Sequence, residues 1–499
     1  MRLAGAEKIG TSAERVLAGL IRSAPRLRCD WAFLGRVVGD RKPGVDDAPE
    51  RVRAFLVVRA REVDMKRDEI IAKARDFLVP TSLLSDIVPA AEGPVIARAE
   101  GSLSYDTEGN GYLDFNSGQM CSALGHNNPR IGKVIAQQSS VLTHASTVYY
   151  NVPQVELAER LAAINDAPLR KSVFGESGSD SNELAVLLAR RATGRMAIGA
   201  LTQAFHGLSD AMRAISYSAV GPGYGPPMPE VFAIPTPYCY RCPYRGEARE
   251  CCMAPLHFGM ETLDRQSGAA PAAVIVEPIV SAGGVIELPV AYLRGLRKEL
   301  DRRGALLIYD EAQTGLGKLG QMFAYQVYGV RPDVLTLSKH LGGGLAISAA
   351  ITSDDVSDRA TRNGLSIGHS HSSDPLACKA GIASIDEIVE NDLPKRALEI
   401  GNLWQANLRA LQQRYEIIGD IRGRGLLQGI ELVRDRRTKE PATQIAADIY
   451  RHCLADRLMF SVRGKFNNVL RFVPPFTTTN AQLDKATEIL EAGMRRAIG

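Results

Sequence analysis

Short apolar runs that end in turn residues recur through the middle of the chain, and longer amphipathic segments separate them. Runs of strand length lie at about 172–174, 196–202, 272–276, 305–309 and 334–337. Apolar stretches this short, bounded by glycine and polar residues, are typical of buried parallel strands. Helical spacing fills the intervals, for example at 180–192 and 291–303. Strands that alternate with helices predict an α/β fold with a mainly parallel, doubly wound sheet.

Both ends of the chain depart from this pattern. Short strand-like pieces follow one another at 95–99, 102–105 and 112–115, with hairpin turn residues at 106–111. From about residue 391 the pattern predicts a smaller α+β unit, with helices at 394–415, 443–455 and 480–497 and strands at 426–433 and 469–473. Residues 1–65 show helical spacing only at 13–20 and 52–63.

Two of the predicted central strands end in chemically distinctive residues. The run 305–309 leads into Asp310 and Glu311, and the run 334–337 leads into Ser338 and Lys339. Because open α/β sheets bind ligands at the carboxyl ends of their strands, we expect this acid and this amine to share one site. An isolated lysine and aspartate could form a structural ion pair. The alternative is a Schiff-base lysine with the aspartate on a pyridine nitrogen, the arrangement that pyridoxal phosphate needs.

The residues around the pair favour the second interpretation. The segment from Asp310 to Gly320 follows the pattern DE-x-Q-x-G-x-G-(+)-x-G, and Ser338-Lys339 precedes a glycine turn. In this the chain resembles the class III aminotransferases, and the resemblance extends from about Arg67 to the end. It implies a fold-type-I transferase that binds pyridoxal 5'-phosphate. It also implies the following division: residues 1–65 an N-terminal extension of unknown role, 66–120 and 391–499 the two parts of a small domain, and 121–390 a large cofactor-binding domain.

The resemblance also implies a role for particular residues. Lys339 would bind the cofactor covalently and move the proton, and Asp310 would hold the pyridine nitrogen protonated. The other expected cofactor contacts are Ser177, Gly178 and Ser179 on the phosphate, Phe205 on the ring face, Gln313 on the ring 3-oxygen, and Ser370 on the phosphate of a neighbouring subunit's cofactor. Arg471 would bind the substrate carboxylate, since a guanidinium on an apolar strand suits bidentate pairing. His206 is expected to orient its loop rather than to take part in catalysis.

Within the family the chain looks most like the 2,2-dialkylglycine decarboxylase branch, through segments such as 113–120 and 277–289. That likeness implies release of CO2 and a ketone from an α,α-disubstituted amino acid, followed by amino transfer to a keto acid such as pyruvate. Gln119 would bind the departing carboxylate, and Thr147, Ser370 and Asp374 match positions of an alkali-cation (K or Na) site. The chain departs from the pattern of this branch at two positions, with Phe205 in place of tryptophan and Ala282 in place of serine. An ordinary class III aminotransferase or an amino-acid epimerase remains the alternative.

Charge and composition narrow the kinds of partner and the cellular location that we expect. A net charge of +4 over 499 residues gives no reason to expect a nucleic-acid partner. No apolar run reaches the length of a membrane span, and the start lacks a signal-peptide apolar block, so we expect a cytoplasmic protein without a membrane partner. The substrates would be small amino and keto acids. Because Ser370 would serve a neighbouring site, the resemblance implies a homodimer or a tetramer with shared active sites.

Two groups of potential metal ligands leave alternatives open. Four of the eight cysteines cluster, at Cys239, Cys242, Cys251 and Cys252. The spacing allows a structural zinc site, but adjacent cysteines are awkward ligands and no second CxxC follows, so we favour a loop with reduced thiols. Two histidines and Asp374 in the loop 368–375 could also bind a transition metal, but no ligand spacing repeats there.

Overall fold

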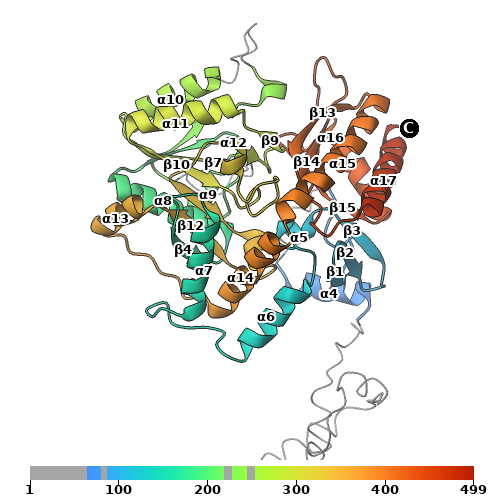
Figure 1. Ribbon diagram of the computed structural model, residues 1–499. Helices are drawn as coiled ribbons and strands as arrows, with labels where there is room; N and C mark the ends of the chain where they lie inside the picture. The colour runs from blue at the N-terminus through green and yellow to red at the C-terminus, as the bar shows by residue number, and fades with distance from the viewer. Residues whose placement is uncertain (1–64, 80–86, 219–227, 244–252) are drawn as a thin grey trace, which may run out of the picture. The chain divides into compact units, whose positions relative to one another are not determined.

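The computed structural model describes residues 65–79, 87–218, 228–243 and 253–499. The predicted helices at 13–20 and 52–63 therefore lie outside the described residues. Residues Met65–Gly499 form one compact unit, and Figure 1 shows that it consists of a large layered body beside a smaller group of sheets and helices. Among the described residues, no helix is long and apolar enough to cross a membrane.

A seven-stranded sheet forms the centre of the large body, with strand order β4-β12-β11-β10-β7-β5-β6. The bounds are β4 (Lys171–Gly175), β5 (Ala197–Leu201), β6 (Val231–Ile234), β7 (Pro271–Val276), β10 (Leu306–Asp310), β11 (Val334–Leu337) and β12 (Ser348–Thr352). β10 pairs in parallel with β7 and β11, whereas β12 runs antiparallel to both of its neighbours. The mainly parallel α/β sheet predicted from the sequence is confirmed, and β6 and β12 are strands that the sequence pattern did not predict.

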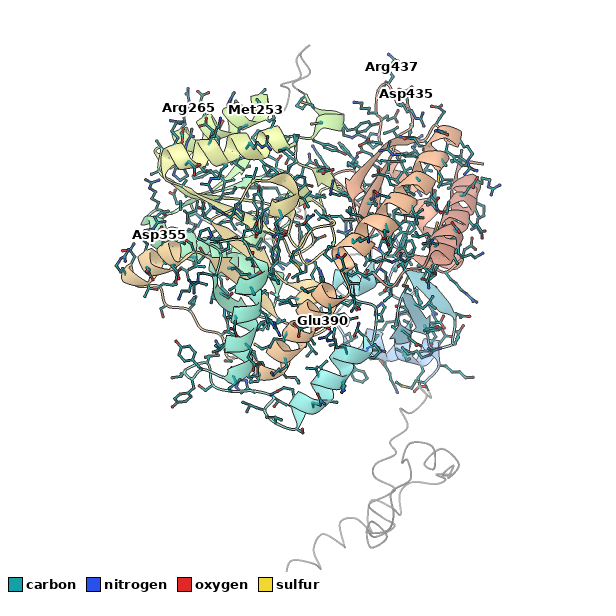
Figure 2. All side chains as sticks on the ribbon, in the orientation of Figure 1. Met253, Arg265, Asp355, Glu390, Asp435 and Arg437 are labelled. Atoms are coloured by element: carbon teal, nitrogen blue, oxygen red, sulfur yellow. The ribbon has the colours of Figure 1, made fainter. Side chains whose placement is uncertain are left out.

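Helices cover both faces of this sheet, which explains its continuous apolar strands. Leu306 and Ile308 of β10 pack in one core cluster with α8 (Gly178–Thr193) and α13 (Asp354–Arg362). Leu307 and Tyr309 of the same strand belong to the other core cluster, on the face of α11 (Val290–Arg303). Side chains fill the space between these layers, while labelled charged residues such as Arg265, Asp355 and Glu390 lie on the outside (Figure 2).

The remaining helices of the large body surround these layers. They are α6 (Pro129–Ser139), α7 (Val152–Ile164), α9 (Asp210–Arg213), α10 (Met253–Ser267), α12 (Ala324–Tyr328), α14 (Pro375–Glu390) and the 3-10 turns η1 (Cys239–Arg241) and η2 (Lys339–Gly342). A two-stranded ribbon, β8 (Ile279–Val280) with β9 (Ile286–Glu287), follows β7. α14 packs against both α6 and α7 and against η2, so it supports the turn that carries Lys339.

Two small sheets complete the unit. The first has the order β1-β2-β3-β15 and joins β1 (Ile96–Glu100), β2 (Leu103–Asp106) and β3 (Gly111–Asp114) to β15 (Leu458–Met459). The second has the order β13-β14-β17-β16, from β13 (Ile418–Arg424), β14 (Leu427–Leu432), β16 (Ser461–Arg463) and β17 (Val469–Phe472). The helices α4 (Arg67–Phe77), α5 (Ser117–Met120), α15 (Leu393–Arg414), α16 (Thr443–Ala455) and α17 (Asn480–Ile498) accompany them. β13 extends through Arg422, ahead of the strand predicted at 426–433, because its residues pair with β14 as far as Arg424.

Candidate active site

Lys339 and Asp310 lie at the carboxyl ends of neighbouring parallel strands. Asp310 is the last residue of β10 and is in register with Thr336 of β11, and Lys339 follows β11 in the left-handed region, with φ +54°. Both side chains line one cavity of about 220 Å³. A left-handed conformation is costly for a lysine, so the fold holds this residue in place at an energetic cost. The structure brings together the acid and the amine that the sequence placed at separate strand ends.

Asp310 is buried but well supplied with donors. Asn182 Nδ2 donates to its Oδ2 at 2.8 Å, His206 Nδ1 lies 2.9 Å from the same oxygen, and the amide of Ala312 donates to Oδ1 at 3.1 Å. Burial alone would raise the pKa of Asp310, but the hydrogen bond and charge of His206 and the charge of Lys339 lower it below its ordinary value. Asp310 is therefore an ionised carboxylate that faces the cavity.

Burial shifts the pKa of the Lys339 amine in the opposite direction. It lowers the pKa of Lys339, and the charge of Asp310 opposes this only in part. A lysine that is easier to deprotonate is a better nucleophile and a better base at neutral pH. The pair thus combines a permanent negative charge with an amine that can lose its proton.

The amino terminus of α8 forms another wall of the same cavity. Ser177, Gly178 and Ser179 all line it, and the first amides of a helix have no acceptor within the helix, so this end attracts an anion. The hydroxyl of Ser177 is used as the helix cap, since it accepts from the amide of Asp180 and donates to its carboxylate at 2.9 Å. Ser179 Oγ accepts from the amide of Leu208 at 3.1 Å. Anion binding here therefore depends mainly on backbone amides.

Phe205 and Gln313 line the cavity between these groups. The amide of Phe205 donates to Oε1 of the buried Glu277 at 2.9 Å, which fixes the loop that carries the ring. Burial raises the pKa of Glu277 to about 7. Gln313 accepts a hydrogen bond through Oε1 from Arg471 at 3.2 Å, so its amide nitrogen is left to donate. The cavity therefore offers a flat apolar face and an amide donor as well as the charged pair.

Arg471 is a buried cation at the border of this cavity. It is 2% exposed, and its guanidinium donates to Ser461 Oγ at 3.0 Å, to Ser281 Oγ at 3.1 Å and to Gln313. Within the described ranges no carboxylate of the chain pairs with it. Because a buried charge needs a partner, this guanidinium is suited to a carboxylate that arrives with a ligand. Ser281, directly before Ala282, supplies a hydroxyl that was not among the contacts predicted from the sequence.

Gln119 lies on a left-handed turn; its side chain is exposed and is not part of the lining of the cavity around Lys339. Four consecutive residues, Ser117 to Met120, have φ between +47° and +66°, and α5 packs against η2, which begins with Lys339. Asp114 holds the turn by accepting from the amides of Gly118 at 2.9 Å and Asn116 at 3.0 Å. Asn116 Nδ2 donates to the side-chain oxygen Oε1 of Gln119 at 2.7 Å. The amide nitrogen of Gln119 is thus available as a donor.

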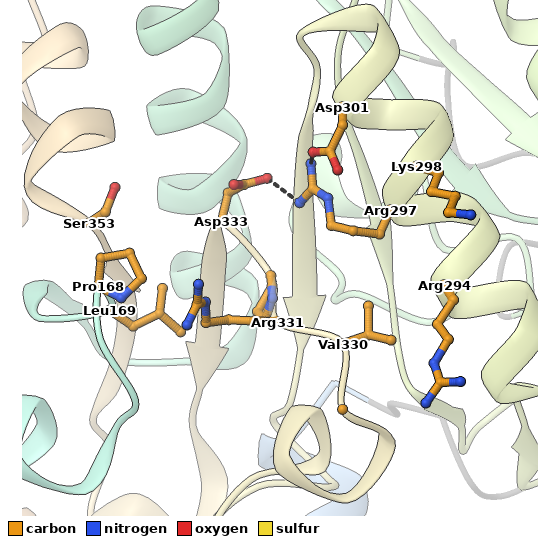
Figure 3. A pocket seen from close by; sticks show the side chains of 12 residues that line it. Pro168, Leu169, Arg294, Arg297, Lys298, Asp301, Val330, Arg331, Asp333 and Ser353 are labelled. Carbon is orange, nitrogen blue, oxygen red and sulfur yellow. Dashed lines mark hydrogen bonds and ion pairs between the residues drawn. The ribbon is translucent and has the colours of Figure 1, made fainter.

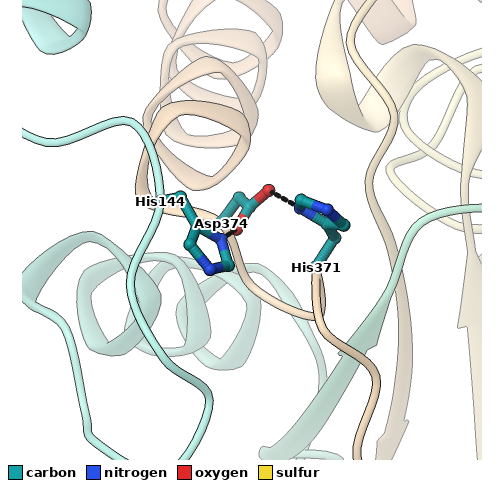
Figure 4. Close-up of side chains that lie close together, drawn as sticks. All are labelled: His144, His371 and Asp374. Carbon is teal, nitrogen blue, oxygen red and sulfur yellow. Dashed lines mark hydrogen bonds and ion pairs between the residues drawn. The ribbon is translucent and has the colours of Figure 1, made fainter.

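Ser370, Thr147 and Asp374 lie outside this cavity. Ser370 and Thr147 are exposed, and the Asp374 carboxylate oxygens lie 2.6 Å from His144 Nδ1 and 2.7 Å from His371 Nδ1 (Figure 4). The alkali-cation set Thr147, Ser370 and Asp374 stays a prediction. The three potential ligand atoms lie within 4.8 Å of one another, and one of the two imidazoles belongs to His144, outside the loop 368–375, so the transition-metal site stays a prediction.

A second cavity lies at the opposite end of the central strands. It measures about 510 Å³ and is lined by Arg294, Arg297 and Asp333 among others (Figure 3). Arg297 pairs with Asp333 and with Asp301, both at 2.6 Å. This second cavity lies where β10 and β11 begin, away from the carboxyl ends of the strands, so it is separate from the site of Lys339 and Asp310.

The proposed zinc ligands are only partly within the described residues. Cys239 is exposed and Cys242 is buried, whereas Cys251 and Cys252 lie outside the described residues. The choice between a zinc site and reduced thiols therefore remains as the sequence left it.

Some contributors to the site were not in the predicted set. Asn182 and His206 bind the Asp310 carboxylate, and Thr336 Oγ1 donates to Asn182 Oδ1 at 2.7 Å. His206 orients more than its loop, because its ring contacts the charged acid itself. The sequence carried a signal for both residues, since His206 directly follows Phe205 and Asn182 follows Ser179 by three residues on the same helix.

An ionised buried carboxylate, an activated amine and a helix amino terminus around one cavity define a pyridoxal-phosphate enzyme, and the cavity's donor set fits that cofactor. A family model described as aminotransferase class-III matches residues 88–494, and the chain belongs to the class-III aminotransferase family. It is accordingly a pyridoxal-phosphate-dependent enzyme whose substrates are small amino and keto acids.

Similar proteins agree with this assignment. The chain is 35% identical over 404 residues to an uncharacterized aminotransferase of Schizosaccharomyces pombe, covering 80% of this chain and 90% of that one. It is 34% identical to a leucine/methionine racemase of Thermococcus litoralis, over 86% of this chain and 95% of the relative. An aminotransferase structure from Bacillus anthracis superposes with a TM-score of 0.81 at 26% identity, covering 87% of this chain and 100% of that chain.

Proposed function

We propose that the enzyme is a decarboxylating aminotransferase. It would release CO2 and a ketone from an α,α-disubstituted amino acid and pass the amino group to a keto acid such as pyruvate. The observation that carries the proposal is the presence of two separate groups suited to a carboxylate. They are the buried guanidinium of Arg471 and the amide nitrogen of Gln119 on its left-handed turn.

The cofactor contacts follow from the cavity. Pyridoxal phosphate, when bound, supplies an electrophilic carbonyl carbon and an electron sink for the bond that breaks at Cα. Lys339 would hold it covalently, Asp310 would pair with the pyridine nitrogen, and Gln313 would donate to the ring 3-oxygen. The amides of Gly178 and Ser179 at the start of α8, with Ser177 beside them, would hold the phosphate, and Phe205 would cover the ring face.

Substrate orientation would then decide which bond breaks. An α,α-disubstituted amino acid has no Cα–H, so loss of CO2 is its productive route. Gln119 would donate a hydrogen bond to the carboxylate that leaves as CO2. Arg471 would bind the carboxylate of the keto acid bidentately. Lys339, with its lowered pKa, would carry the proton in the amino-transfer step.

Ordinary amino transfer and epimerisation use the same cofactor contacts, and one relative is named a racemase. Those reactions remove a Cα proton and keep the carboxylate on the substrate. They would therefore require Arg471 and Lys339, whereas Gln119 would have no departing carboxylate to bind. Gln119 is the residue that separates these reactions from decarboxylation.

We also propose that the active unit is a homodimer with shared sites. The segment that precedes α7 exposes several large apolar side chains. Val141, Tyr149 and Tyr150 are 73% to 91% exposed, and Leu142 is 42% exposed. Ser370, which is exposed in this chain, would reach the phosphate of the other subunit's cofactor. An exposed apolar segment of this kind is typical of a protein–protein interface.

The test is to separate the two half-reactions in the variant Gln119→Ala. Single-turnover measurements with 2-aminoisobutyrate report the decarboxylating half, and measurements of the aminated enzyme with pyruvate report the transfer half. We expect a loss of roughly tenfold or more in the first and a much smaller change in the second. Equal losses in both halves, or no loss in the first, would refute the role of Gln119.

A further inference from the structure

A third cavity, of about 540 Å³, adjoins Arg471 on the side of the small sheets. Ser461 lines it and accepts a hydrogen bond from Arg471 Nε, while Gln313 lines the cofactor cavity and accepts from Nη1 of the same guanidinium. Asn116 and Gly118, from the turn that carries Gln119, also line it. The third cavity therefore lies next to the groups proposed to bind the substrate carboxylates.

Arg463 is an unpaired cation in the wall of this cavity. It lies on β16 and its guanidinium makes one hydrogen bond, from Nη1 to the carbonyl oxygen of Val462 at 3.1 Å. Across the described ranges of the chain no carboxylate lies within ion-pair distance of it. Burial lowers its pKa, which means that the charged form lacks compensation from the protein. A half-buried guanidinium in this state is suited to an anion supplied by a ligand.

A second polar group of the cavity is also open. Tyr450 lines it, and among the described residues nothing hydrogen-bonds to its hydroxyl, although the charges of Arg463 and Asp114 both act on it. Asp114, by contrast, is fully engaged by His126 at 2.8 Å and by the backbone amides of Asn116 and Gly118. The Arg463 guanidinium and the Tyr450 hydroxyl are thus two groups of this cavity that remain free to bind a ligand.

The spacing of the two arginines defines the ligand's length. Ser461 is opposite Arg471 in the pairing of β16 with β17, and Arg463 follows Ser461 by two residues on the same strand face. Arg463 is therefore the diagonal neighbour of Arg471, and such positions lie roughly 7–8 Å apart; both side chains are long and can converge. A dicarboxylic acid with a backbone of four or five carbons spans this interval, with one carboxylate on each guanidinium.

We propose that Arg463, with the Tyr450 hydroxyl, binds a second acidic group at the far end of the substrate, so that the enzyme prefers dicarboxylic amino and keto acids. This inference rests on the proposed function for the placement of the first carboxylate on Arg471. It adds a specificity-determining residue and a substrate class: short-chain acids with a terminal carboxylate, in place of the simple alkyl side chain of 2-aminoisobutyrate.

Equilibrium binding to the holoenzyme tests the proposal without turnover. Glutarate carries two carboxylates, and its monoamide, glutaramate, has the same size with one carboxylate. Calorimetry should show that glutarate binds about 10- to 100-fold more tightly, as expected for a charge-assisted hydrogen-bonded pair. Arg463→Met should abolish that preference while glutaramate affinity stays within about twofold, and Arg463→Lys should restore part of it. Arg471→Met should instead weaken both ligands.

Two results would overturn the inference. One is equal affinity of the wild-type holoenzyme for glutarate and glutaramate, and the other is a glutarate preference that survives in Arg463→Met. The cofactor absorbance band of Arg463→Met confirms that the variant is folded and loaded. Turnover then separates this inference from the proposed function. Decarboxylation of 2-methylglutamate in preference to 2-methylglutamine supports both the inference and the proposed function. If the holoenzyme prefers glutarate but releases no CO2, the inference stands and the proposed function is wrong.

Discussion

Burial disfavours the charged form of individual side chains in this enzyme, and the neighbouring groups decide whether a side chain keeps its charge. Asp310 and Lys318 are both buried, but only Asp310 has partners that favour its charged form. Lys318 Nζ has one long hydrogen bond, to the carbonyl oxygen of Met120 at 3.5 Å, and burial lowers its pKa to about 7. The first residue is thus a permanent charge and the second changes charge near neutral pH.

The permanent charge of Asp310 can be tested by Asp310→Asn. The amide keeps the size and most hydrogen bonds but removes the charge that would hold the pyridine nitrogen protonated. We expect the variant to bind the cofactor and to lose roughly a hundredfold or more in kcat, measured together with the cofactor absorbance spectrum. Wild-type rates in this variant would exclude the role.

The lowered pKa of Lys318 predicts a pH-dependent stability. The unfolded lysine has a pKa of 10.5 and the folded one of about 7, so the unfolded state binds more protons between these values and stability rises with pH there. Lys318→Met removes this contribution. The Tm of the wild type relative to the variant should rise by about 1 °C per pH unit from pH 7 to 9. A constant difference across that range would contradict the assignment.

At the scale of elements, strand ends and one strained turn build the site. Sequence patterns predicted the strands that deliver Asp310 and Lys339, because buried parallel strands are continuous apolar runs that end in recognisable residues. They did not predict β12, which follows a glycine-rich turn, or the left-handed turn Ser117 to Met120. That turn exists because Asp114 accepts two of its amides, a contact that depends on tertiary structure.

Gly118→Ala tests whether the turn positions Gln119. Gly118 has φ +52°, and an added Cβ would lie 3.0 Å from Cε1 of His126. We expect the turn to shift and the decarboxylating half-reaction to slow by roughly tenfold or more. Gly132→Ala is the matched control, since Gly132 lies in α6 with nothing within 4 Å of the added atom. Loss of activity in the control, or none in Gly118→Ala, would count against the positioning role.

At the scale of the whole molecule, segments distant in sequence meet around the site. β15 pairs with β3, and Arg471 on β17 reaches Ser281 and Gln313 of the large body. The family resemblance anticipated Arg471 because its motif position is recognisable. The partners of Arg471, and the unpaired Arg463 beside it, could not be anticipated, because no local pattern reports which side chains lack a counter-ion after folding.

The proposed dimer makes a prediction at this scale. Tyr150 is 91% exposed in the apolar segment before α7. Light scattering should give the wild type a mass of about twice 54.0 kDa, and Tyr150→Glu should lower it by placing a charge in the interface. Phe258→Glu is the control, because Phe258 is 55% exposed on α10, outside that segment. A wild-type mass of one chain at micromolar concentration would refute the dimer.

The most direct test of the central claim is to measure CO2 released from carboxyl-labelled disubstituted amino acids, with pyruvate and 2-oxoglutarate as acceptors. Both 2-aminoisobutyrate and 2-methylglutamate should be supplied to the holoenzyme. A decarboxylating aminotransferase should give labelled CO2 and a ketone in amounts equal to the amino acid formed from the acceptor. If no disubstituted amino acid releases CO2 while ordinary amino donors transfer their amino groups readily, the decarboxylating function is wrong and simple amino transfer stands.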